Sequence, residues 1–89
     1  MKNIKAEVMG PEPPCWRCIA VKKAVEKVAE KLKTEGIIVQ LERMNIASKE
    51  VVRKYGVLFS PALAINDAVK TMGRIPTEEE VEKLIRSAE

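Results

Sequence analysis

The sequence predicts an α/β fold in which a strand–helix–strand unit is followed by a short helix, a β-hairpin and a last helix. Three observations predict it: two apolar stretches flank a long amphipathic segment, a turn dipeptide separates two further apolar runs, and a helix-capping sequence lies near the C-terminus. The 89 residues are 46% apolar and 33% charged, which is enough to bury one core but not two. We therefore expect one domain over residues 1–89.

The first expected strand runs from Ile4 to Met9 and stops at Gly10. Residues 11–14 then include three prolines, which lack backbone donors and have a fixed φ, so neither a helix nor a sheet strand continues through them. A stiff loop therefore leads the chain to Cys15.

A long helix is expected after Cys15, because apolar residues recur at helical spacing until Gly36 supplies a C-terminal cap. These apolar residues are Val21, Val25, Val28 and Leu32. At about 100° per residue they share one side of the helix, and charged residues, mostly lysines, occupy the other. On the same wheel Cys18 lies toward the apolar side and Cys15 toward solvent, so one sulfur should be buried and the other reachable.

Residues 37–43 are β-branched and largely apolar, which is typical of a buried strand. Together with the first strand and the long helix they form a βαβ unit. Crossovers of this kind are almost always right-handed, so the two strands should be parallel with the helix lying across the sheet.

A shorter helix should begin after the cap Ser48 and end at Gly56, with Val51 and Val52 facing inward. Pro61 then precedes a strand at residues 62–65.

The dipeptide Asn66-Asp67 turns the chain into a partner strand at 68–72, which ends at Gly73. The segment Thr77–Glu80 is a capping box, and Pro76 and Val81 can form the hydrophobic staple of the last helix. Its buried stripe is expected to be Val81, Leu84, Ile85 and Ala88. The predicted order is βαβαββα.

Composition and charge exclude several classes of protein. The net charge of +3 comes entirely from the first 35 residues, and the chain has only one Trp, one Tyr and one Phe, which argues against a nucleic-acid surface. No apolar run approaches the roughly 18 to 20 residues of a membrane helix, and residues 1–7 are too mixed in charge for a secretory signal. We expect a cytoplasmic monomer that binds neither nucleic acid nor membrane.

The two cysteines, Cys15 and Cys18, are the most informative residues, in a chain without histidine. A disulfide between them would close too small a loop to stabilise the chain much. A zinc site needs four ligands, so within one chain no metal is expected. Half of a four-thiolate site shared by two copies remains an alternative.

The expected position of these cysteines at the start of a helix favours ionised, reactive thiols. Unpaired backbone N–H groups and the helix dipole favour thiolate there, and such thiols have pKa values of about 3.5 to 7.5, against about 8.5 for a free thiol. The side chains of Arg17 and Lys22 could add to this effect. Cys15 is the candidate nucleophile, and Cys18, one turn on, is the candidate resolving cysteine.

The chain resembles the small thioredoxin-like, glutaredoxin-sized redox proteins common in archaea and some bacteria. The resemblance covers nearly the whole length and is carried by Cys15-Trp16-Arg17-Cys18 at a helix start, by Tyr55-Gly56-Val57 and by Ser60-Pro61-Ala62-Leu63 before the hairpin. It implies a four-stranded mixed sheet of order 2-1-3-4, with the first and last helices on one face and the short helix on the other. It also implies that Pro61 is cis and lies against the cysteine pair, so that the backbone of Ser60 is free to pair with an extended substrate.

The resemblance further implies a thiol–disulfide oxidoreductase that cycles between a Cys15–Cys18 disulfide and a dithiol, without another cofactor. Its partners would be protein disulfide substrates and a reductase or other dithiol donor. We expect Trp16 and Arg17, with Ser60 and Pro61, to contact the substrate.

Two features differ from larger relatives. Trp16-Arg17 is neither the Gly-Pro of thioredoxins nor the Pro-Tyr of glutaredoxins, which leaves the direction of electron flow open. The buried carboxylate of thioredoxins has no clear counterpart, since Met9 falls near its place and Glu7 fits poorly on spacing.

Two alternatives remain. Trp16 could instead pack over the proline loop. The whole chain could be a binding module without enzymatic activity, either a dimer sharing a metal site of four cysteine thiolates or a redox-inactive adaptor that uses the Trp16 surface.

Overall fold

The structure, a computed structural model, describes residues 2–11 and 16–88 and has the predicted order of elements. The elements are β1 (Lys2–Gly10), α1 (Trp16–Lys33), β2 (Ile37–Asn45), α2 (Lys49–Tyr55), β3 (Ala62–Ile65), β4 (Ala68–Met72) and α3 (Glu78–Ser87). Cys15 and the prolines at 13 and 14 lie outside the described residues.

The four strands form one mixed sheet in the order β2-β1-β3-β4, which confirms the expected topology. Strand β1 is paired on both sides, parallel to β2 and antiparallel to β3. Both β1 and β2 are longer than predicted, because their parallel pairing runs from Lys2 opposite Ile37 to Gly10 opposite Asn45. Apolar patterning marks only the buried part of a strand, whereas backbone pairing continues through its polar ends.

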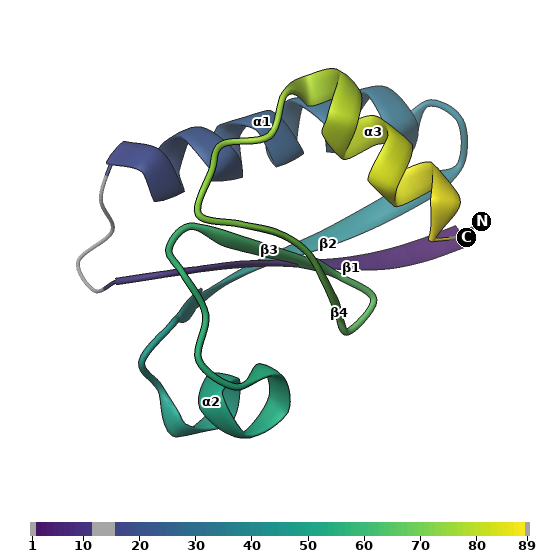
Figure 1. Ribbon diagram of the computed structural model, residues 1–89. Coiled ribbons are helices and arrows are strands. Elements are labelled where there is room, and N and C mark those ends of the chain that lie inside the picture. The colour runs from purple at the N-terminus through teal and green to yellow at the C-terminus, as the bar shows by residue number, and fades with distance from the viewer. Residues whose placement is uncertain (1, 12–15, 89) are drawn as a thin grey trace.

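Helices cover both faces of the sheet, as Figure 1 shows: α1 and α3 lie on one side and α2 on the other. Successive side chains of β1 point to opposite faces, so this strand contributes to two cores. Ile4, Ala6 and Val8 pack with the apolar stripe of α1 and with Val81 and Ile85 of α3. On the other face the buried residues of the second core are Met9, Val51, Ala62 and Ala64.

Two details of the helices differ from the sequence predictions. In α2 only Val51 is buried, whereas Val52 is 42% exposed, because neighbouring helical residues point about 100° apart and this short helix has a narrow contact with the sheet. At α3 the Thr77 hydroxyl caps the Glu80 N–H at 3.1 Å, as expected. The Glu80 carboxylate, however, accepts hydrogen bonds from Arg74. The Glu80 side chain, which would complete the capping box, thus forms an ion pair with Arg74 instead.

Salt bridges join α3 to α1 at the rim of their apolar contact. Lys31 lies 2.8 Å from Glu82, and Arg86 lies 2.9 Å from Glu35. Exposed pairs of this kind contribute little individually, so the buried stripe of α3 contributes most to its docking. None of the described helices combines the length and apolarity needed to cross a membrane.

Candidate redox site

Cys18 lies in the first turn of α1, and its side chain is completely buried. It begins the same stripe that continues through Val21 and Val25, so helical spacing alone directs it toward the sheet, as predicted. The stripe brings its sulfur against the backbone of Gly10 at the end of β1. A Cβ atom built on Gly10 would lie only 2.1 Å from Cys18 Sγ, so this position has room for the sulfur only because glycine has no side chain.

Ser60 approaches the same sulfur from a third segment, the loop between α2 and β3. Its Oγ lies 3.5 Å from Cys18 Sγ, within hydrogen-bonding distance for sulfur. The Ser60–Pro61 peptide bond is cis, and Pro61 is buried. The Pro61 carbonyl accepts a 2.9 Å hydrogen bond from the Gly73 N–H just after β4. Gly10, Cys18 and Ser60, which we call the sulfur site, therefore meet from segments far apart in the sequence.

The remaining predicted site residues differ in what the structure describes. Cys15 lies outside the described residues, so its role as nucleophile stays a prediction. Trp16 is 69% exposed and does not pack into the core. The Arg17 guanidinium lies 5.6 Å from the centre of the Trp16 ring, a cation–π contact at the start of α1.

The structure also exposes two apolar residues that the sequence analysis gave no role. Val57 and Phe59, in the loop leading to Ser60, are 89% and 72% exposed. Both lie in the loop between α2 and β3. Apolar residues in a predicted loop belong to no buried face of a helix or strand, and the sequence could have indicated their exposure in this way. Both therefore leave a large apolar side chain exposed to water in the loop that precedes Ser60.

Glu7 is a buried carboxylate that the sequence analysis set aside on spacing. It is 2% exposed, near the middle of the central strand, and points to the α2 side, opposite to the face that Gly10 turns toward Cys18. The Tyr55 hydroxyl donates a 2.5 Å hydrogen bond to Glu7 Oε1, and Lys54 Nζ lies 3.6 Å away. Lys54 also pairs with Asp67 of the hairpin turn. An acidic residue inside an otherwise apolar strand was the signal for this network.

This network changes the acidity of its members. Burial, reinforced by the hydrogen bond to Glu7, raises the pKa of Tyr55 to about 12. The hydrogen bond with Asp67 raises the pKa of Lys54, and the same contact lowers the pKa of the Asp67 carboxyl. These charges are thus held as ion pairs at neutral pH.

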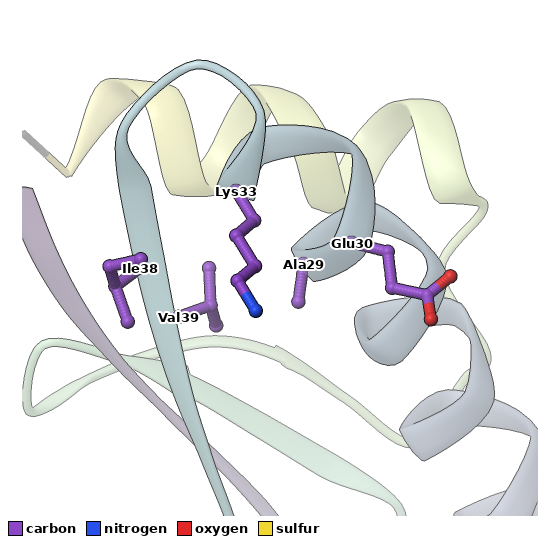
Figure 2. Close-up of a pocket in the computed structure, with 5 residues that line it drawn as sticks. All are labelled: Ala29, Glu30, Lys33, Ile38 and Val39. Atoms are coloured by element: carbon purple, nitrogen blue, oxygen red, sulfur yellow. The ribbon is translucent and has the colours of Figure 1, made fainter.

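Two hollows of about 230 Å³ lie away from the sulfur site. One is bounded by the Glu7 network and β2. The other, shown in Figure 2, lies between the second half of α1 and β2, and Glu30 directs its carboxylate away from the other lining residues. Neither hollow is lined by Cys18 or Ser60.

A buried cysteine in the first helical turn, with the Ser60 hydroxyl beside it, and a 2-1-3-4 sheet covered on both faces are the features of a thioredoxin-like protein. Residues 3–86 match the family model described as "Thioredoxin domain", and the chain therefore belongs to the thioredoxin domain family.

Among solved structures, the chain is similar to oxidised thioredoxin from Plasmodium falciparum. The TM-score is 0.63 and the identity 12%, over 98% of this chain and 82% of that one, a likeness of fold. The search of curated proteins finds no match.

The contact between Gly10 and Cys18 leads to a stability prediction. Gly10→Ala should lower the free energy of unfolding by about 1 to 3 kcal/mol, because the new methyl group overlaps the sulfur. In a Cys18→Ala background the same substitution should cost clearly less. Urea unfolding of the four proteins completes this double-mutant cycle, and an equal cost in both backgrounds would show that the sulfur is not what the methyl group meets.

The Glu7–Tyr55 hydrogen bond leads to a pH prediction. Tyr55 is the only tyrosine of the chain, so its ionisation is measurable by absorbance, and its pKa should be about 12. Glu7→Gln should lower this pKa, because the neighbouring negative charge is lost. Glu26→Gln, on the exposed side of α1 across the sheet, is the matched control and should leave it unchanged.

The same pKa fixes a dependence of stability on pH. Tyr55 has a higher pKa in the folded chain than the value of about 10 in an unfolded one, so its contribution is complete below pH 10 and is lost as the pH rises toward about 12. Tyr55→Phe should lack this part of the loss in unfolding experiments. An unchanged alkaline profile in Tyr55→Phe would contradict the assignment.

Proposed function

We propose that this chain is a thiol–disulfide oxidoreductase in which Cys15 is the nucleophile and Cys18 the resolving cysteine. One observation carries the proposal: in a thioredoxin-domain chain, the Cys18 sulfur is buried in the first turn of α1, against Gly10 and beside the Ser60 hydroxyl. A second thiol three residues earlier in the sequence supplies the partner that a disulfide exchange requires.

The reaction proceeds in two exchanges. The Cys15 thiolate attacks one sulfur of the substrate disulfide, forming a mixed disulfide and releasing the first substrate thiolate. The Cys18 thiolate then attacks Cys15 Sγ, which forms the Cys15–Cys18 disulfide and releases the second substrate thiolate. The substrate gains two electrons, the chain loses two, and the two protons from the cysteine thiols pass through water to the substrate thiolates. A reductase or other dithiol donor restores the starting state.

Substrates are proposed to be disulfide-containing proteins that bind over Trp16, Arg17, Ser60 and Pro61. The exposed ring of Trp16 and the exposed apolar loop residue Phe59 support a polypeptide partner, because exposed aromatic side chains offer apolar contact area to a protein surface. Arg17 adds a positive charge and hydrogen-bond donors for backbone carbonyls or acidic side chains.

Reduction of insulin disulfides by dithiothreitol tests this function. The wild-type chain should accelerate the reduction, and Cys15→Ser should abolish the acceleration because no mixed disulfide forms. Ser87→Ala, on the exposed side of α3, is the control for an ordinary substitution and should retain full activity. An inactive wild type that binds stoichiometric zinc per dimer would instead support a shared metal site.

Alkylation rates give an independent prediction. At neutral pH Cys15 should react with iodoacetamide much faster than Cys18, because Cys18 is completely buried in the structure. Mass spectrometry of peptides from partly alkylated protein measures both rates, and the Cys15→Ser and Cys18→Ser variants measure each alone. Equal rates, or a Cys15 rate typical of a free thiol, would refute activation at the helix start.

A further inference from the structure

We propose that the Ser60 hydroxyl donates a hydrogen bond to the Cys18 sulfur when Cys18 becomes a thiolate, and that it thereby accelerates resolution of the mixed disulfide. This inference rests on the proposed function and assigns Ser60 a role in addition to contact with the substrate. It comes from the 3.5 Å separation of Ser60 Oγ and Cys18 Sγ.

Burial strengthens the effect of such a donor. Cys18 is completely buried, so its thiolate forms out of contact with bulk water. A buried charge without a hydrogen-bond donor is strongly disfavoured, whereas one that accepts a hydrogen bond is stabilised. In the thiol form either Sγ or Oγ can be the donor, but after loss of the sulfur proton only the hydroxyl can donate.

The surroundings of the sulfur keep this geometry. Gly10 contacts the sulfur on the sheet side, so Sγ cannot move further toward β1. Ser60 precedes Pro61, whose carbonyl is held by the Gly73 N–H at 2.9 Å. The backbone that carries the Ser60 hydroxyl is therefore held to the residue that follows β4.

The hydrogen bond acts in one exchange of the cycle. Cys18 gives its proton to water, the thiolate attacks Cys15 Sγ, the bond between Cys15 and the substrate sulfur breaks, and the substrate leaves as thiolate. The two electrons stay with the leaving sulfur, and the hydroxyl keeps its own proton throughout. Once Cys18 is part of a disulfide its sulfur is only a weak acceptor, so the hydrogen bond favours the thiolate over the product.

The size of the effect follows from thiol chemistry. A thiol that is more acidic forms more thiolate, but each thiolate is less nucleophilic, with a Brønsted coefficient of about 0.4 to 0.5. A tenfold larger thiolate population at neutral pH therefore raises the rate only about threefold to fourfold. A hydrogen bond to a charged group changes such a population by about tenfold or more, so Ser60→Ala should slow resolution at neutral pH by about threefold or more. At alkaline pH, where the rate of resolution no longer rises with pH in either protein, Ser60→Ala should be as fast as the wild type or faster.

Stopped-flow reaction of the reduced chain with 5,5′-dithiobis(2-nitrobenzoate) separates the two exchanges. The first phase releases one thionitrobenzoate as Cys15 reacts and depends on reagent concentration. The second releases another as Cys18 attacks the mixed disulfide, and its rate is independent of reagent. We would record the second phase from about pH 6 to pH 10, which spans the ionisation of an ordinary thiol.

Three variants complete the experiment. Ser60→Ala should move the pH profile of the second phase, whose rate does not depend on binding of the reagent, to higher pH. Ser60→Thr retains a hydroxyl and should behave like the wild type. Ser87→Ala removes a hydroxyl from α3 and controls for any effect of a serine substitution as such.

The outcomes distinguish this inference from the function on which it rests. A second phase that is unchanged in Ser60→Ala, or slowed by one factor at every pH, would overturn the inference alone, because a displaced sulfur is slow at all pH values. A wild-type chain that releases a single thionitrobenzoate would overturn the proposed function and the inference together.

Discussion

The close approach of the Cys18 sulfur to the backbone of Gly10 is the contact on which the rest of the site depends. Helix α1 can lower its first turn onto the end of β1 only where the strand carries no side chain. Strand β1 is paired with β2 through Gly10 and with β3 through Met9, so its end is held in the sheet. The distance of the sulfur from the sheet is thereby fixed. Ser60, in the loop before β3, lies within hydrogen-bonding distance of this sulfur.

Side chains alternate along β1, so its two faces make different contacts. The face toward α1 carries small and apolar residues and ends in Gly10, which allows close packing of the helix. The opposite face carries Glu7, which holds Tyr55 and Lys54 at the C-terminal end of α2. The loop that delivers Ser60 starts directly after Tyr55. A buried acid on one face therefore fixes the origin of the segment that supplies the hydroxyl on the other.

Two aromatic side chains of the described residues are largely exposed to water. Trp16 and Phe59 remain largely in water although each has a large ring, and burial of such rings in a core would stabilise the fold. Neither position faces a core, because Trp16 opens α1 on its outer side and Phe59 lies in a loop. Trp16 therefore contributes to the surface of the molecule and not to its core.

The sequence by itself determined the order of elements and the stripe of α1 that buries Cys18. It also determined the turn of the hairpin and the N-terminal cap of the last helix. These features rest on spacings of a few residues, which the backbone geometry of helices and turns converts directly into faces and boundaries. Only the tertiary structure decided that Ser60 meets Cys18, 42 residues away, and that Glu7 meets Tyr55, 48 residues away. Such contacts depend on strand register and on how far a helix can approach the sheet. Those quantities are set by packing of the whole chain, which local spacing does not encode.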